Sequence, residues 1–212
     1  MSRALLRRIE PATGGIYVRG FPWQKKTVEQ VGISSLAANV LCKRHNSQLS
    51  GLDGEALRLV DLIERWHSRE PGVFAGTVCG EKIERYLLKV LCGALAARSA
   101  CAQGARIISG IPDRWTDLLF GDSPFPAGWG LYLNAHVGDR WDNDPRTYSV
   151  APVLLNAEPA GLCAVLRGFR LVLLMADPGP NPEGAVDSGR IRHPKCIEAN
   201  HPHGQVSIRF LW

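Results

Sequence analysis

Apolar residues recur with helical spacing in two stretches near the middle of the chain. The first stretch follows an i, i+3, i+4, i+7 pattern, and Ser50 and Asp53 just before it have the S-x-x-D spacing of a capping box. The apolar positions are Ala56, Leu59, Val60, Ile63 and Trp66. The pattern predicts a helix from about Gly54 to Ser68, with Ser50 as its N-cap and Asp53 as a helix-start residue.

The second stretch predicts another amphipathic helix, which ends near Cys101 and packs against the first. Its apolar stripe consists of Ile83, Leu87, Val90, Leu91 and Ala94. The charged residues Glu84, Arg85 and Lys89 fall between these positions, and we interpret them as a solvated face. A short third helix is expected from Pro112 to Phe120, because proline is tolerated at the start of a helix.

Period-two alternation and turn residues predict strands on both sides of these helices. Near the N-terminus we expect short strands at Ile16 to Val18 and Gly32 to Leu41, and a further strand at Val73 to Cys79 follows the first long helix. The second half is mainly β, with strands expected around Trp129 to Leu133, Tyr148 to Leu155, Leu162 to Leu166, Phe169 to Met175 and Val206 to Trp212. Residues Asp177 to Gly189 are rich in Pro, Gly, Asn and Asp, and predict a long surface loop.

These elements together predict an α+β protein. The order is a ββα segment at the N-terminus, a central pair of amphipathic helices and a C-terminal antiparallel sheet. We divide the chain at the end of the first long helix, into residues 1–70 and residues 71–212, and expect the two parts to pack as one compact unit.

The composition is that of a globular protein, with 45% apolar and 21% charged residues among 212. No apolar run is long enough to cross a membrane, and the basic N-terminus lacks the apolar core of a secretory signal. We therefore expect a cytoplasmic protein without membrane contact. The six cysteines show no regular spacing, so we expect most of them to be free thiols.

Positive charge is concentrated in the first 50 residues. This part carries eight Lys and Arg against two Glu, a net +6, whereas the remaining 162 residues sum to −1. Such an excess favours contact with a polyanion, DNA or RNA, although a solvated basic face has about the same prior. The candidate nucleic-acid-binding residues are Arg7, Arg8, Lys25, Lys26, Lys43 and Arg44.

The basic part also contains a CxxHN cluster, formed by Cys42, His45 and Asn46. A thiol and an imidazole at this spacing supply two ligands to one metal ion, whereas tetrahedral zinc takes four. The cluster is thus half of a metal site. The alternative is structural, with Asn46 as a turn residue that bonds nearby backbone.

Two runs resemble a known family. Asn39-Val40-Leu41-Cys42-Lys43-Arg44-His45-Asn46 is similar to the N-L-x-x-L-C-x-x-C-H segment of HNH nucleases, which have the ββα-metal fold related to the treble clef. Ser2-Arg3-Ala4 with Ala12-Thr13-Gly14-Gly15 resembles the S-R-A-H-I-I-P-E-A-L-G-G entry of an HNH-like group of bacterial proteins. The resemblance covers roughly the first 55 residues and implies a bacterial or phage protein.

By this resemblance, Cys42 and His45 match the second zinc-knuckle pair, and Asn46 matches the position that holds a divalent ion, zinc or magnesium, in phosphodiester cleavage. His45 and Asn46 are then the candidate catalytic residues, with Cys42, His45 and Asn46 as metal ligands. Two features depart from the family pattern. Arg7 stands where the general-base histidine is expected, and the first CxxC knuckle has no counterpart.

A second possible metal group lies near the C-terminus, where His193, Cys196, His201 and His203 fall within 11 residues. Imidazole and thiolate are ligands that zinc accepts, although the spacing matches no known motif and a polar surface loop is the alternative. A composite site that joins Cys42 and His45 to two of these residues is also conceivable.

Phosphate-binding loops, dinucleotide-binding glycine motifs and the serine-hydrolase elbow are absent from the sequence, so we expect no nucleotide cofactor. The leading functional hypothesis is a divergent HNH-like protein that binds nucleic acid, either as a metal-dependent endonuclease or as an inactive relative. The competing hypothesis is an interaction or small-ligand-binding module, in which the CxxHN cluster is structural and the β half carries the specificity. The sequence indicates no particular protein partner.

Overall fold

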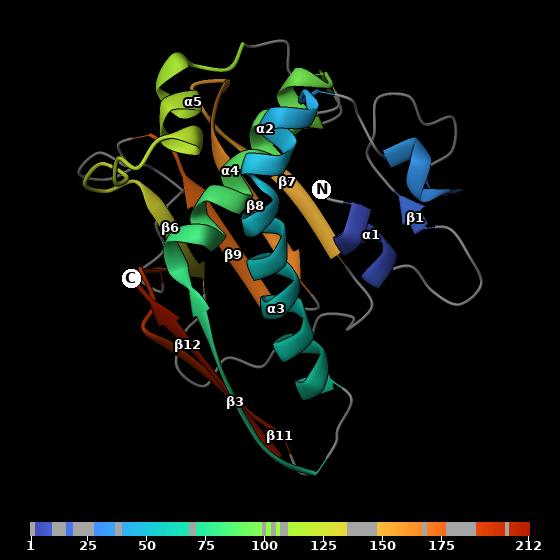
Figure 1. Ribbon diagram of the computed structural model, residues 1–212, viewed down its shortest axis with the longest axis vertical. Helices are drawn as coiled ribbons and strands as arrows, with labels where there is room; N and C mark the ends of the chain where they lie inside the picture. Colours follow the sequence, from blue (N-terminus) through green and yellow to red (C-terminus); the bar gives the residue numbers. More distant parts are fainter. Residues whose placement is uncertain are drawn as a thin grey trace.

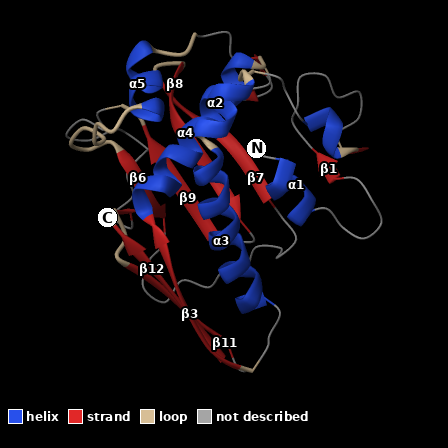
Figure 2. Ribbon diagram, viewed as in Figure 1, coloured by secondary structure: helices blue, strands red, loops and turns tan. Residues whose placement is uncertain are grey.

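The computed structural model describes twelve stretches of the chain: residues 3–9, 16–18, 28–36, 40–67, 71–98, 101–102, 105–106, 110–134, 148–166, 169–176, 190–201 and 204–212. Its helices are α1 (Arg3–Ile9), α2 (Lys43–Gln48), α3 (Ser50–His67), α4 (Gly80–Ala96) and α5 (Asp113–Phe120), with a 3-10 turn, η1, at Ile33–Leu36. In Figures 1 and 2, α3 and α4 lie side by side in front of a layer of strands.

The two long helices form where the apolar stripes predict them. Leu59, Val60 and Ile63 of α3 are buried, as are Leu87, Leu88 and Leu91 of α4, so the two stripes contribute to the same core. The helix α3 begins at Ser50, four residues earlier than expected, and α4 ends at Ala96 rather than near Cys101. The predicted short third helix is confirmed as α5.

Twelve strands occur in the described part of the chain. They are β1 (Ile16–Val18), β2 (Glu29–Val31), β3 (Gly72–Cys79), β4 (Cys101–Ala102), β5 (Ala105–Arg106), β6 (Gly130–Asn134), β7 (Tyr148–Leu155), β8 (Glu158–Leu166), β9 (Phe169–Leu174), β10 (Arg190–Arg192), β11 (Cys196–His201) and β12 (Gly204–Leu211). The larger sheet has the order β10-β6-β9-β8-β7 and is antiparallel throughout. The expected antiparallel sheet in the C-terminal half is thereby confirmed.

A second sheet joins the end of the chain to its middle. Its order is β11-β12-β3, and β12 pairs with β11 in the antiparallel and with β3 in the parallel sense. The strand β3 runs directly into α4, which packs on β6, β8 and β9 of the larger sheet. The start of α4 therefore lies near the place where the two sheets approach each other (Figure 1).

The N-terminal part contains a hairpin of β1 and β2 followed by helices, with α1 before it. The order of hairpin and helix is that of the expected ββα segment. The expected strand at Gly32 to Leu41 is wrong, because β2 ends at Val31 and Ile33–Leu36 form η1. A short apolar run without strict alternation does not distinguish a strand from a helical turn.

One buried cluster extends through both predicted halves of the chain. It includes Leu5 of α1, Leu49 before α3 and Phe210 of β12, together with the stripes of α3 and α4. Residues 1–70 and 71–212 therefore share a core. Among the helices that the structure describes, none combines the length and apolar character needed to cross a membrane.

Candidate functional site

The CxxHN cluster lies at the first turn of α2. Cys42 immediately precedes the helix and accepts the backbone N–H of Asn46 at its carbonyl oxygen, over 2.9 Å. Side chains three positions apart share one face of a helix, and the Cys42 Sγ and His45 Nδ1 atoms are accordingly 3.4 Å apart. Cys42, His45 and Asn46 are all exposed.

This spacing fits two ligands of one zinc ion, because Zn–S and Zn–N bonds of about 2.3 and 2.0 Å at a tetrahedral angle place the two donor atoms roughly 3.5 Å apart. The described residues do not complete the set, since no group of three or more His, Cys, Asp or Glu side chains positioned for a metal ion occurs among them.

The side chains around the cluster pack against a neighbouring helix or bond to nearby backbone. The His45 ring lies against the Phe120 ring of α5, with centroids 5.0 Å apart. Just beyond α2, the Ser50 hydroxyl donates to the Ser47 carbonyl at 2.7 Å. The predicted N-cap role of Ser50 is therefore wrong, because Ser50 is the first residue of α3 and its hydroxyl donates backward instead of accepting a helix N–H.

Asp53, in the first turn of α3, binds Lys89 of α4. The Lys89 Nζ atom lies 2.8 and 2.9 Å from the two carboxylate oxygens and 3.4 Å from the Leu49 carbonyl oxygen. Both side chains are largely buried. The interpretation of Lys89 as part of a solvated face is therefore wrong, because it ties α4 to the start of α3.

The six candidate nucleic-acid-binding residues are in three different situations. Arg7, Lys43 and Arg44 are exposed, and they form no ion pair with any other described residue. Arg8 is engaged with two carboxylates of α3: Nε lies 2.9 Å from Asp61, and Nη2 contacts Glu64. Lys25 and Lys26 lie outside the described residues.

The second predicted metal group is not brought together. Cys196 begins β11 and His201 ends it, and at about 3.3 Å per residue the two are roughly 16 Å apart, too far to share an ion. The exposed Cys196 thiol instead lies 3.4 Å from the Ser207 hydroxyl. His193 faces a carboxylate on α4, and His203 lies outside the described residues.

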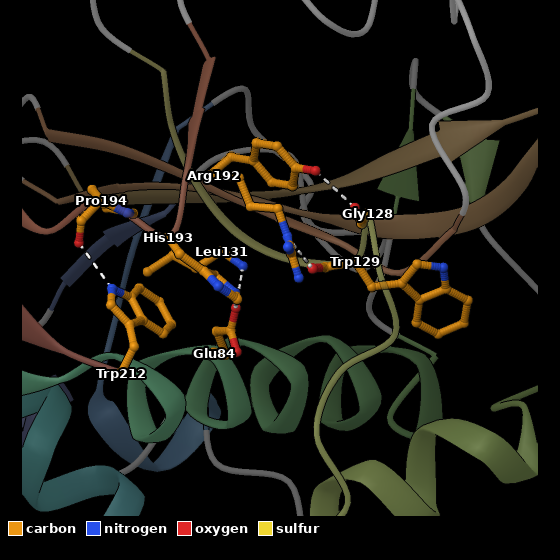
Figure 3. Close-up of polar contacts among 9 residues, drawn as sticks. Glu84, Gly128, Trp129, Leu131, Arg192, His193, Pro194 and Trp212 are labelled. Atoms are coloured by element: carbon orange, nitrogen blue, oxygen red, sulfur yellow. Dashed lines mark hydrogen bonds and ion pairs between the residues drawn. The ribbon is translucent and has the colours of Figure 1, made fainter.

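That carboxylate is Glu84, the one polar or charged residue found buried in the described part of the chain. Its side chain is 3% exposed. Glu84 Oε1 accepts the backbone N–H of Leu131 in β6 at 2.5 Å and lies 2.7 Å from His193 Nε2 (Figure 3). The site thus joins α4, β6 and the turn between β10 and β11.

The backbone around the pair is arranged to admit it. His193 has φ 48°, in the left-handed region that non-glycine residues rarely adopt, and its N–H donates to the Leu131 carbonyl at 2.9 Å. Gly130 has φ +115°, and a Cβ atom there would lie 2.2 Å from Glu84 Oε1 and 2.9 Å from His193 Nε2. Glycine is therefore required at position 130 both for its conformation and for its size.

One face of the His193 ring is covered by Trp212, the residue after β12. The two ring centroids are 4.0 Å apart, and the planes differ by 20°. The Trp212 indole N–H in turn donates to the Pro194 carbonyl at 3.0 Å, which fixes the indole ring (Figure 3). The imidazole is therefore held at Nε2, along one face and through its own backbone.

Burial dominates the ionisation of the pair. It raises the pKa of Glu84 to about 7, although the Leu131 N–H and the charges of Arg192 and Arg85 act in the opposite direction. Burial and the Arg192 charge together lower the pKa of His193. Burial thus disfavours the charged form of both groups.

Two arginines lie beside Trp129, the residue before Gly130. Arg192 is exposed, its Nε donates to the Trp129 carbonyl at 3.0 Å, and its terminal nitrogens have no partner among the described residues. Arg114 of α5 lies over the Trp129 ring, 4.6 Å from its centroid. Both positive charges thus lie beside Trp129, and that of Arg192 acts on His193.

The sequence did carry a signal for Glu84. It stands three, four and seven positions before Leu87, Leu88 and Leu91, all of which are buried. A carboxylate inside an apolar stripe indicates a buried acid with a partner elsewhere in the fold. The interpretation of Glu84 as part of a solvated face is therefore wrong, and so is that of Arg85, which binds the carbonyl oxygens of Leu118, Gly121 and Ser123.

Comparison with known proteins yields no relative. No protein-family model, no curated protein and no solved structure matches the chain.

Proposed function

We propose that this protein binds nucleic acid through an exposed basic surface formed by Lys43 and Arg44 of α2, which we call the α2 surface. The proposal is carried by the contrast between these cations and their neighbours. Arg8 and Lys89 are matched by carboxylates, whereas Lys43 and Arg44 are exposed without a described counter-charge. Cations without a carboxylate partner contribute most to polyanion binding, because a phosphate that binds them displaces only water and counterions and does not compete with a carboxylate.

The position of these cations supports the proposal. Lys43, Arg44 and Asn46 belong to one short helix, and all of them are exposed. Phosphate contacts are made by Lys and Arg, and Asn side chains contact phosphate or base edges. The resemblance to HNH nucleases concerns the same residues and is an independent reason to expect nucleic acid as the ligand.

Binding can be measured by fluorescence anisotropy with labelled single- and double-stranded DNA and RNA at several salt concentrations. In Lys43→Gln/Arg44→Gln we expect roughly ten-fold weaker binding at moderate salt. We also expect the slope of log K against log salt for duplex DNA to become less negative by about two, because two phosphate contacts are lost and each contributes about 0.9.

A charge-matched control is Arg170→Gln/Arg209→Gln, since both arginines are exposed and lie on β9 and β12. The control should bind as the unmodified chain does. Equal losses in both double variants would mean that only total charge matters, and unchanged binding in Lys43→Gln/Arg44→Gln would contradict the proposal. The latter result would favour a module whose specificity lies in the β half.

A further inference from the structure

A second site, distant in sequence from the α2 surface, lies around Glu84 and His193. We propose that His193, held in place by Glu84, is a general base that activates water against an anionic phosphodiester bound beside Arg192. The α2 surface takes no part in this inference, which rests on the geometry of the second site alone.

The first argument is that one nitrogen of His193 is fixed and the other is open. Nε2 faces Glu84 Oε1 at 2.7 Å beneath Gly130. Among the described residues no partner of Nδ1 occurs, and the His193 side chain is 30% exposed.

The second argument is that the carboxylate selects the useful tautomer. When Glu84 is ionised, Nε2 carries the proton and its N–H donates a hydrogen bond to Oε1, so that Nδ1 presents a lone pair. A proton taken up at Nδ1 gives an imidazolium that the buried carboxylate stabilises. This is how a carboxylate supports a histidine base in hydrolytic enzymes.

The third argument is that the arrangement is costly for the fold. It combines a buried carboxylate, a histidine at φ 48° and a glycine at φ +115°. Packing alone would be served better by an apolar residue at position 84, in line with its apolar neighbours on α4. Strained and buried polar groups that converge on one partly exposed imidazole are typical of functional sites.

The charges around the imidazole indicate an anionic substrate. Arg192, whose charge acts on His193, and Arg114, over the Trp129 ring, provide two guanidinium groups. Arg85 and Glu81 of α4 act on Glu84, and Glu81 also acts on His193. Guanidinium groups bind phosphate oxygens with two parallel hydrogen bonds. Arg192, with its terminal nitrogens available, is the residue that binds the phosphate.

In the proposed step, His193 Nδ1 removes a proton from water as the water oxygen forms a bond to phosphorus. The bond from phosphorus to the leaving oxygen breaks, and that oxygen departs with the electron pair. The imidazolium then returns the proton to the leaving oxygen or to solvent. No oxidant or reductant is consumed, and Glu84 acts as a positioning residue.

The test uses the full chain with bis(4-nitrophenyl) phosphate in EDTA, and follows the release of 4-nitrophenolate. We expect His193→Gln to lower the protein-dependent rate at least about 100-fold, as for loss of a general base. Arg192→Gln should mainly raise KM. Glu84→Gln should lower kcat and remove the part of the fall in rate below about pH 7 that protonation of Glu84 is expected to cause in the unmodified chain.

Glu198→Gln is the matched control for Glu84→Gln, because Glu198 is exposed on β11 and should leave rate and pH profile unchanged. Should His193→Gln not fold, as judged by circular dichroism, modification of the unmodified chain with diethyl pyrocarbonate replaces it. The rate should then fall in step with the modification of His193, located by peptide mapping. Release no faster than in buffer, or equal release by His193→Gln, would overturn the proposal. A larger rate enhancement over buffer with neutral 4-nitrophenyl acetate than with the phosphodiester would overturn the anionic substrate class.

Discussion

Gly130 is the residue on which the geometry of the Glu84–His193 pair most directly depends. A methyl group there would enter the space between the carboxylate and the imidazole, at a φ that disfavours any side chain. We expect Gly130→Ala to lower the free energy of unfolding by at least about 2 kcal/mol, and to separate Glu84 from His193. Urea denaturation measures the first effect, and a pH titration of the His193 ring by NMR measures the second.

The matched control is Gly93→Ala on α4, where a Cβ atom would meet no heavy atom within 4 Å. Alanine in a helix interior is favoured over glycine, so the free energy of unfolding of this variant should rise by about 0.5–1 kcal/mol. Equal stability of the two variants would show that a Cβ atom at position 130 fits between Glu84 and His193 without cost.

At the scale of elements, α3 and α4 are joined by the Asp53–Lys89 ion pair as well as by apolar contacts. The side chains are 18% and 12% exposed. We expect Lys89→Met to lower the free energy of unfolding by about 2 kcal/mol, less than for a fully buried pair, because Asp53 is left with little water and no cation.

Asp53→Asn combined with Lys89→Met should cost less than the sum of the single changes, since the double variant has no unpaired charge. Thermal or urea denaturation of the four proteins gives this coupling, and Lys82→Met, an exposed lysine of the same helix, should change stability little. Additive effects would mean that the pair contributes nothing beyond its separate side chains.

The apolar stripes were sufficient to predict α3 and α4, and the stripe of each helix is buried. Local sequence patterns also predicted α5, from Pro112 at its start, and the strands β3, β7 and β9 to within one residue. The pairing of β3 with β12 could not be predicted in the same way. It joins Val73 to Gln205 and Cys79 to Leu211 in parallel, across more than half of the chain. No local pattern specifies which distant strand is the neighbour.

The same distinction applies to the candidate sites. Cys42 and His45 were predicted to lie together, and they do, because both belong to one helical turn. Glu84 and His193 are 109 positions apart, and their contact depends on the packing of α4 against β6 and on the turn after β10. His193, which the sequence grouped with nearby cysteine and histidine residues, thus has its partner on a distant helix.

At the scale of the whole molecule, the Glu84–His193 pair makes stability depend on pH in a particular direction. The pKa of Glu84 rises from 4.5 to about 7 on folding. Between these values the unfolded chain has lost the proton that the folded chain still holds, so raising the pH favours unfolding, and above about pH 7 the penalty is constant. The lowered pKa of His193 acts oppositely, since below pH 6.5 the unfolded imidazole takes up a proton first.

Glu84→Gln separates the two contributions, because the amide does not titrate. The free energy of unfolding of the unmodified chain, minus that of Glu84→Gln, should fall by up to about 3 kcal/mol between pH 4.5 and 7.5, with the change centred between the two pKa values of Glu84. Urea denaturation of both proteins at half-unit steps of pH measures this difference, with Glu198→Gln as the exposed control. A difference that stays constant across this range would mean that Glu84 is ionised in the folded protein at acidic pH. In that case the buried carboxylate would be charged throughout and would accept a hydrogen bond from His193 Nε2–H over the whole range.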